Sequence, residues 1–294
     1  MEKKQDRLIR GTAMDGRVRA FAVRTTQLVE ELRRRHDTYP TATAALGRTL
    51  TAGAIMGSML KGKERLTIQV KGNGPIGQII VDANAAGEVR GYVAEPHVHL
   101  PSNSMGKLDV AGAVGTEGFI HIIKDLGLKE PYRGSIPIIS GELGEDFTYY
   151  FAKSEQTPSA VGLGVLVDTD NSVIVAGGFI IQLLPGLNDD EITAIENAVG
   201  SLPPVTALLD QGLELDEMLR WMLPDVRVLD ETDIHFQCEC TRERVEKTLV
   251  SLGESELTQL IEEEGQAEVV CHFCNEAYQF NKDDLQNLLD QAKA

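Results

Sequence analysis

The sequence contains no long apolar run. No stretch approaches the roughly 18 consecutive apolar residues that a membrane-spanning helix requires, so we expect no contact with a membrane. The first residues also lack the apolar centre and the small-residue cleavage site of a secretory signal. Together these absences predict a cytoplasmic protein, in a compartment where thiols stay reduced.

Recognisable catalytic motifs are missing as well. No G-x-S-x-G occurs, and no nucleophile is grouped with a base; His97 and His99 belong to a loop and are expected at the surface. Residues 72–77 match G-x-G-x-x-G, but a strand-like run follows them where a dinucleotide site needs a helix. We therefore assign no catalytic residue and no cofactor-binding glycine loop, and we expect a protein that is not an enzyme.

Basic residues are scarce in the last third of the chain. Residues 1–186 hold 21 Lys and Arg against 20 Asp and Glu, residues 187–230 hold 2 against 10, and residues 231–294 hold 5 against 15. Nearly all of the formal net charge of −17 therefore lies after residue 186. Since nucleic-acid affinity is built from cationic contacts, this distribution argues against a nucleic-acid partner.

The neutral part, residues 1–186, is rich in short strand-like runs joined by tight turns. Examples are residues 17–24, the pair 65–72 and 78–84 on either side of a glycine-rich loop, and the run 147–154 (FTYYFAKS). Residues 41–61 predict a helix rich in small residues, which suits close packing in a core. The pattern favours an α+β domain with a mostly antiparallel sheet.

The sequence pattern changes from strand-like runs to short helical stretches after Pro185-Gly186. Residues 188–200 predict a helix with an acidic start, and two more short helical stretches follow the break at Pro203-Pro204. Helices this short are marginal alone, so we interpret residues 187–230 as an acidic helical connector that rests on another part of the protein. Residues 231–294 form the third predicted part, a small C-terminal domain.

Cysteine is absent until residue 238 and then occurs four times. Cys238, Cys240, Cys271 and Cys274 make the pattern C-x-C…C-x-x-C. Two close pairs of thiolates can complete a tetrahedron around one ion, and four sulfur ligands suit zinc with no open position left for a reacting water. A structural disulfide pair and an iron–sulfur cluster remain as less favoured readings. With four thiolates present, we expect neither His235 nor His272 to be a ligand.

A zinc site here has a consequence for stability. The acidic C-terminal segment has little core and repels itself, whereas structural zinc supplies roughly 10–16 kcal/mol of folding free energy in small modules. Oxidation of thiolate ligands to sulfenic acid or disulfide would eject the metal. The segment is therefore predicted to unfold when it is oxidised, and the marginal connector before it is predicted to unfold with it.

The cysteine pattern, the neutral α+β part and the acidic connector together resemble the 33 kDa chaperonin family, the redox-regulated heat-shock holdases. The likeness extends over essentially the whole chain and includes residues 74–93, the small-residue helix around residues 44–59 and the run 177–186. All four cysteine positions match the family pattern.

The resemblance implies a mechanism. The reduced, zinc-loaded form is an inactive monomer; peroxide or hypochlorous acid, helped by heat, pairs Cys238 with Cys240 and Cys271 with Cys274 and releases zinc. The zinc domain and then the connector unfold, and the active protein forms a homodimer that holds unfolding client proteins without ATP.

Two other readings stay open at this point. A zinc-ribbon module that binds nucleic acid or protein would need a basic face, which the C-terminal segment lacks. A thiol–disulfide oxidoreductase would use Cys271 and Cys274, but such a C-x-x-C normally begins a helix in a βαβ unit.

Overall fold

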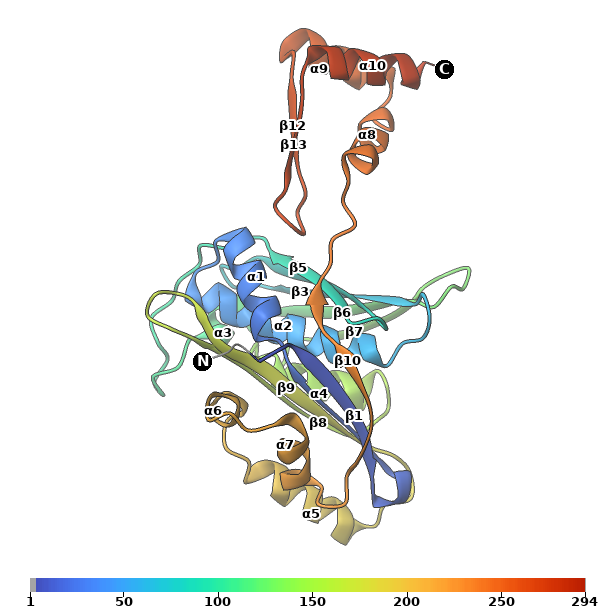
Figure 1. Cartoon of the computed structure of the whole chain (residues 1–294). Coiled ribbons are helices and arrows are strands. Elements are labelled where there is room, and N and C mark those ends of the chain that lie inside the picture. Colours follow the sequence, from blue (N-terminus) through green and yellow to red (C-terminus); the bar gives the residue numbers. More distant parts are fainter. Residues whose placement is uncertain (1–3, 294) are drawn as a thin grey trace. The chain divides into compact units, whose positions relative to one another are not determined.

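The computed structural model describes residues 4–293, which form two compact units (Figure 1). The first unit ends at Gln237 and the second begins at Cys238. The predicted α+β class with antiparallel sheets is confirmed.

A five-stranded antiparallel sheet, sheet A, forms one layer of the first unit. Its strands in spatial order are β10 (Arg227–Asp233), β1 (Arg7–Ala13), β2 (Val18–Arg24), β9 (Val173–Leu183) and β8 (Ser159–Val167). Along β2 and β9, successive apolar side chains point to opposite faces, so both faces of this sheet are apolar.

A six-stranded sheet, sheet B, forms the second layer. Its strands in spatial order are β11 (His235–Phe236), β5 (Glu88–Val93), β4 (Gln78–Asn84), β3 (Arg65–Gly72), β6 (Gly118–Asp125) and β7 (Tyr132–Pro137). All neighbours are antiparallel except β11, which runs parallel to β5. The glycine-rich loop 73–77 joins β3 to β4, so the predicted hairpin is confirmed at the site of the dinucleotide-like motif.

One helix occupies the space between the two sheets. It is α2 (Pro40–Ser58), which contacts β3, β4 and β5 of sheet B and β2, β8 and β9 of sheet A. The predicted small-residue helix and its burial are thus confirmed. The other helices of this half of the unit are α1 (Thr26–His36), α3 (Val110–Val114) and α4 (Gly144–Lys153).

Glycines let α2 lie close to both layers. A Cβ atom at Gly47 would come within 2.7 Å of Val165 on β8, and one at Gly53 would come within 2.7 Å of Val81 on β4. Real Cβ atoms need more room than this, so any larger residue would force the helix away from one sheet or the other.

One predicted strand is wrong. Residues 147–154 belong largely to helix α4, which buries Phe147, Tyr150 and Phe151 on one face. The carboxylate of Asp146 accepts hydrogen bonds from the backbone amides of Ile139 and Leu143, at 2.7 and 2.8 Å, and so fixes the start of the helix. The buried aromatic residues are spaced three and four positions apart, which fits a helix as well as the sequence pattern fits a strand. The hydrogen bonds of the buried Asp146 carboxylate at the start of the segment favour the helix.

The acidic segment 187–230 covers the second face of sheet A. It contains α5 (Asp189–Gly200), α6 (Val205–Asp210) and α7 (Leu215–Met222), and the first residues of β10. The predicted acidic cap is confirmed, since Asn188 and Glu191 exchange side-chain-to-backbone hydrogen bonds at 2.9 Å. The connector's buried side chains form one cluster with sheet A: Ile195, Val205, Leu208, Leu209, Leu215, Met218, Leu219, Met222, Leu223 and Val226.

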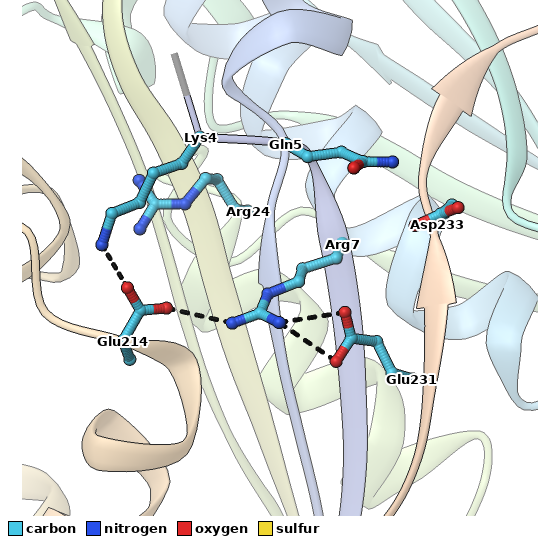
Figure 2. Close-up of a pocket in the computed structure, with 7 residues that line it drawn as sticks. All are labelled: Lys4, Gln5, Arg7, Arg24, Glu214, Glu231 and Asp233. Atoms are coloured by element: carbon cyan, nitrogen blue, oxygen red, sulfur yellow. Dashed lines mark hydrogen bonds and ion pairs between the residues drawn. The ribbon is translucent and has the colours of Figure 1, made fainter. Parts of the chain in front are cut away.

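Ion pairs fasten this segment and β10 to the N-terminal strands (Figure 2). Arg7 on β1 bonds Glu214 at the start of α7 and Glu231 on β10, each at 3.0 Å, and Lys4 also pairs with Glu214. Arg17 bonds both carboxylate oxygens of Glu191 at 2.8 Å. The hydrogen bond from Lys4 and the nearby Arg7 hold the pKa of Glu214 below its usual value. The acidic residues of the segment thus meet basic residues of the core, although each exposed pair contributes only about 0–1 kcal/mol.

The second unit is small. Its elements are α8 (Arg242–Val250), α9 (Glu254–Glu263), the hairpin β12 (Ala267–Val270) and β13 (Ala277–Phe280), and α10 (Lys282–Ala292). Its buried core consists of Leu249, Leu257, Ile261, Phe280, Leu285, Leu288 and Leu289. Among the helices of residues 4–293, none combines the length and apolar character that a membrane span needs.

A buried carboxylate joins β1 to α1 in the first unit. Asp6 is 2% exposed, and its Oδ2 accepts a hydrogen bond from the backbone amide of Leu28 at 2.8 Å, in the first turn of α1. Burial raises the pKa of Asp6 to about 6, although the amides of Leu28, Gln27 and Thr26 and the charge of Arg24 act in the opposite direction.

This carboxylate should make the first unit less stable as the pH rises. In the unfolded chain an aspartate has a pKa of about 3.9, so between about pH 4 and pH 6 the folded state binds the proton of Asp6 more tightly than the unfolded state does. The contribution of Asp6 to the free energy of unfolding therefore decreases through this window, by about 3 kcal/mol in total. Asp6→Asn, which keeps an acceptor for Leu28, should remove that dependence.

The measurement is urea unfolding at pH 4.5 and pH 7, followed by circular dichroism, for both proteins. Comparing the variant with the parent at each pH cancels the titration of all other groups. An equal difference in unfolding free energy at the two pH values would contradict the assignment.

Candidate metal centre

The second cysteine pair lies in the turn of the β12–β13 hairpin. The amide of Cys271 donates to the carbonyl of Glu276 at 2.9 Å, and the amide of Asn275 donates to the carbonyl of Cys271 at 2.8 Å. Asn275 has a φ of 58°, a left-handed conformation that asparagine tolerates better than most residues. This tight turn brings the sulfurs of Cys271 and Cys274 to one site.

The first pair lies just before α8 and is fastened to the same hairpin. Thr241 caps α8, because its side-chain hydroxyl oxygen accepts a hydrogen bond from the backbone amide of Arg244 at 3.2 Å. The guanidinium of Arg242 donates to the carbonyl of Gln279 on β13 at 2.8 Å and lies 4.4 Å from the ring centroid of Phe280. These contacts help to hold Cys238 and Cys240 near the turn.

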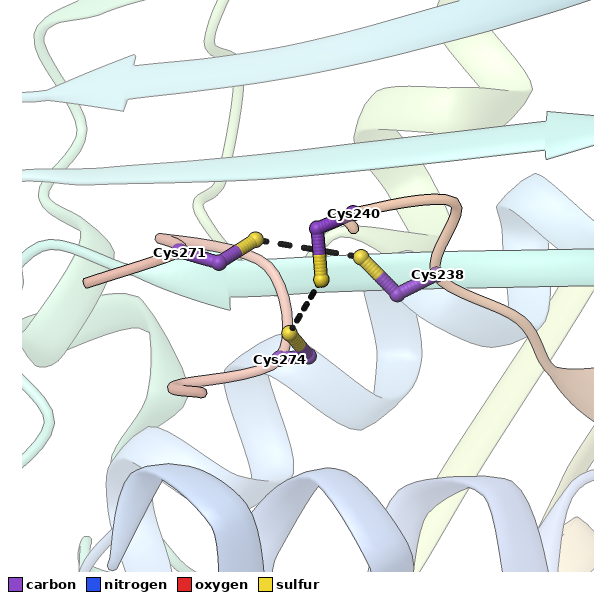
Figure 3. Close-up of side chains that lie close together, drawn as sticks. All are labelled: Cys238, Cys240, Cys271 and Cys274. Carbon is purple, nitrogen blue, oxygen red and sulfur yellow. Dashed lines mark hydrogen bonds between the residues drawn. The ribbon is translucent and has the colours of Figure 1, made fainter. Parts of the chain in front are cut away.

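The four sulfurs form one tight group (Figure 3). Cys238 Sγ lies 3.8 Å from Cys271 Sγ, Cys240 Sγ lies 3.1 Å from Cys274 Sγ, and all four lie within 4.8 Å of one another. None of the four cysteines forms a disulfide bond, which would require an S–S distance of about 2.05 Å. A tetrahedral site with Zn–S bonds of about 2.3 Å has edges of about 3.8 Å; the separation of Cys238 and Cys271 matches this edge, and that of Cys240 and Cys274 is shorter than it.

The compactness of the group bears on the kind of metal. Each cysteine of a four-iron cluster binds a different iron, which spreads the sulfurs farther apart than the edges of one tetrahedron. Four sulfurs within 4.8 Å are compatible with a single ion held by four thiolates.

The thiols differ in their electrostatic surroundings. Burial raises the pKa of Cys238, but hydrogen bonds from the Cys240 amide and the neighbouring thiols outweigh it, so the net direction is downward. Burial raises the pKa values of Cys240 and Cys274. The hydroxyl of Tyr278 donates to Cys240 Sγ at 3.3 Å, which raises the pKa of the tyrosine.

No histidine joins the group. Among residues 4–293, the four cysteines are the sole set of three or more metal-ligating side chains that lie close enough to share an ion. His235 and His272 are exposed, and His97 pairs with Asp37 at the surface at 3.2 Å.

Two residues that support the site were not foreseen from the sequence. Tyr278 bonds a ligand sulfur, and Arg242 fastens the first pair to the hairpin. A signal for Tyr278 exists in retrospect, because it lies four residues after Cys274 on the strand that leaves the turn. Such supporting hydrogen bonds orient metal ligands and raise affinity.

Comparison with known proteins agrees with this architecture. A family model described as Hsp33 protein matches residues 6–281. The chain is 57% identical over 288 residues to the 33 kDa chaperonin of Bacillus cereus (strain B4264), covering 97% of this chain and 99% of that protein. The 33 kDa chaperonin of Bacillus anthracis (strain CDC 684 / NRRL 3495) shows the same identity and coverage.

A solved structure is similar as well. The crystal structure of the 33 kDa chaperonin (heat shock protein 33 homolog) from Thermotoga maritima superposes with a TM-score of 0.93 at 40% sequence identity, covering 98% of this chain and 99% of that one. From the family match, the identity over nearly the whole chain and the shared fold, we conclude that this chain belongs to the Hsp33 family of 33 kDa chaperonins.

Proposed function

We propose that this protein is a redox-regulated holdase that binds unfolding proteins without ATP and prevents their aggregation under oxidative and heat stress. Membership of the Hsp33 family assigns a chaperone function, and hence unfolded polypeptides as clients. The redox control is our inference, and the group of four clustered cysteines without disulfide bonds in the second unit is the observation that carries it.

In the reduced, inactive state, Cys238, Cys240, Cys271 and Cys274 hold one Zn²⁺ through four thiolates. When bound, the ion supplies cross-linking between the two cysteine pairs and no catalytic chemistry, since its coordination is complete. The second unit needs this support, because it has only a small apolar core and residues 238–294 carry 13 acidic against 5 basic residues.

Oxidation would then remove the support. In each pair, two thiolates lose two electrons to one peroxide, an S–S bond forms, and the peroxide is reduced to two waters with protons taken from solvent. We propose the pairs Cys238–Cys240 and Cys271–Cys274, each within a short loop. Cys240 and Cys274, whose sulfurs lie 3.1 Å apart, belong to different pairs, so this pairing requires the group to rearrange as it oxidises.

The connector is the part of the first unit best suited to follow. Its three helices are short, its apolar side chains cover one face of sheet A, and exposed ion pairs fasten its ends. Unfolding of residues 187–230 would uncover that face. We further propose that the active form is a homodimer and that the protein works in the cytoplasm, where thiols begin reduced.

A disulfide oxidoreductase is less well supported. Cys271 and Cys274 lie in a turn between two strands, whereas redox-active C-x-x-C pairs normally begin a helix. The first pair, Cys238 and Cys240, also packs beside them, which suits a closed metal site.

The proposal predicts a coupled change in metal content and activity. The reduced protein should carry one zinc per chain and give little protection to a heat-unfolded client such as citrate synthase. Peroxide at elevated temperature should release the zinc and switch protection on, while reduction of a small disulfide substrate stays slow. Zinc is measured with a chromogenic chelator and aggregation by light scattering.

Peptide mapping tests the pairing in the same sample. Tryptic cleavage separates residues 228–242, which contain the first pair, from residues 248–282, which contain the second. The two peptides should not be linked to each other after oxidation. Full protection by the reduced protein, or oxidation without zinc release, would refute the switch.

Loss of one ligand should weaken the second unit without any oxidant. Cys238→Ser removes a thiolate and should lower zinc affinity by at least about tenfold, since ligand sets lose affinity steeply when incomplete. Residues 238–293 should then be cleaved by protease much faster than in the parent protein. His272→Gln changes an exposed neighbour and is the matched control; equal protease resistance of Cys238→Ser and this control would count against zinc as the support.

The ion pairs of the connector should affect the temperature at which the connector unfolds from sheet A. Arg7→Gln removes the bonds to Glu214 and Glu231, so in the oxidised protein the release midpoint should fall by about 2–4 °C. Trp221, the only tryptophan of the chain, lies on α7 and reports this step through its fluorescence. Arg34→Gln, on the exposed side of α1, should leave the midpoint unchanged; a fall as large in this control would show that the effect is nonspecific.

A further inference from the structure

Strand β8 is an edge strand of sheet A and has a strand neighbour on one side only. Its partner is β9, and within residues 4–293 no strand pairs with its other edge (Figure 1). An unpaired edge offers a row of backbone donors and acceptors to any extended chain.

The register with β9 identifies which groups point outward. The amide of Leu183 bonds the carbonyl of Pro158, so this opposite pair is hydrogen-bonded. Bonded and non-bonded pairs alternate along an antiparallel ladder, so Gly162 and Gly164 also bond toward β9. Leu163 and Val165 therefore turn their amide and carbonyl groups outward, and residues 4–293 supply no hydrogen bond to them.

The outward edge forms the floor of a groove of about 850 Å³. One wall comes from α2 and the loop around Leu108, and the other comes from residues 199–207 of the connector. The lining is mainly apolar and includes Phe179 and Leu202. The groove thus combines unpaired backbone groups with a mostly apolar lining, whose charged members are Arg48, Lys107 and Asp210.

The connector narrows this groove. A Cβ atom at Gly164 would lie 2.7 Å from the methyl group of Thr206, at the start of α6, so the connector stands directly over the middle of β8. Unfolding of residues 187–230 would remove this wall and open the strand along Ser159–Val167.

We propose that the outward edge of β8 is a binding site for extended apolar segments of client polypeptides, which join sheet A as an added strand. The inference rests on the proposed holdase function and names the surface that it uses. Backbone bonds to Leu163 and Val165 would supply affinity for any sequence, and the apolar walls would select the segments that unfolding proteins expose.

A second copy of this chain fits the same edge poorly. The strand is recessed between two walls, so a single extended chain can enter, whereas the equally recessed edge of another copy cannot reach it while the wall formed by α2 and the Leu108 loop is present. An extended client segment has no flanking helices or loops of this kind and can therefore reach the edge of β8.

Hydrogen exchange tests this directly in the full-length protein. The oxidised, zinc-free form is measured alone and with reduced, carboxymethylated α-lactalbumin, a permanently unfolded polypeptide. The amides of Leu163 and Val165 should exchange quickly alone and at least about tenfold more slowly with the client, while those of Gly162 and Gly164 are already protected by β9.

Two outcomes would overturn the proposal. If the client slows neither Leu163 nor Val165 although aggregation is suppressed, clients bind elsewhere and the holdase function stands without this site. If both amides are protected without client, in proportion to protein concentration, a second copy occupies the edge.

A substitution gives an independent test. Val165→Pro removes an outward amide that β9 does not use, a position where edge strands tolerate proline. About fivefold more of this variant should be needed to suppress aggregation, with zinc content and zinc release unchanged. Val165→Thr keeps the amide and the side-chain shape and serves as the control; equal protection by the two variants would refute the role of the edge.

Discussion

Sheet A is apolar on both faces, and each face must be covered from water. Helix α2 and sheet B cover one face through close packing that glycines permit, as at Gly47 and Gly53. The other face is covered by three short helices whose sequence is acidic and whose ends are fastened by ion pairs. The packing on the two faces therefore differs in stability. On the first face α2 and sheet B are part of a continuous core, whereas on the second face the connector helices contact the sheet through one layer of side chains.

Under the proposed function, this asymmetry would let the protein keep its binding surface covered until the connector unfolds. A cover that is marginal by itself can be controlled by whatever stabilises the chain next to it, and the segment that follows β10 and β11 leads directly to Cys238. If the four sulfurs hold the proposed ion, much of the folding free energy of the second unit would come from the metal–sulfur bonds. An oxidant that joins those sulfurs would then act on the second unit first, and the core between the two sheets would remain folded.

The candidate site was largely readable from the sequence because metal ligands are a matter of residue type and spacing. Cys238, Cys240, Cys271 and Cys274 could be assigned to one site without knowing the fold, since two close pairs of thiolates suit one tetrahedral ion. Arg242 and Tyr278 could not be assigned in this way. Their roles depend on the hairpin bringing β13 beside the start of α8, and neither residue type is diagnostic of a metal site.

The sequence by itself determined the α+β class, the burial of the helix at residues 40–58, the acidic start of α5 and the four-cysteine pattern, because each rests on local composition or short-range spacing. Only the tertiary structure decided that residues 147–153 are helical, that the end of the acidic segment pairs with β1 as β10, and that β8 is left as an open edge. The helical state of residues 147–153 depends on the burial of Asp146, whose carboxylate accepts hydrogen bonds from the backbone amides of Ile139 and Leu143. The other two features depend on contacts between residues far apart in the chain: basic residues of β1 that meet acids more than 200 positions away, and the order of strands in a sheet. Local patterns carry no information about such partners.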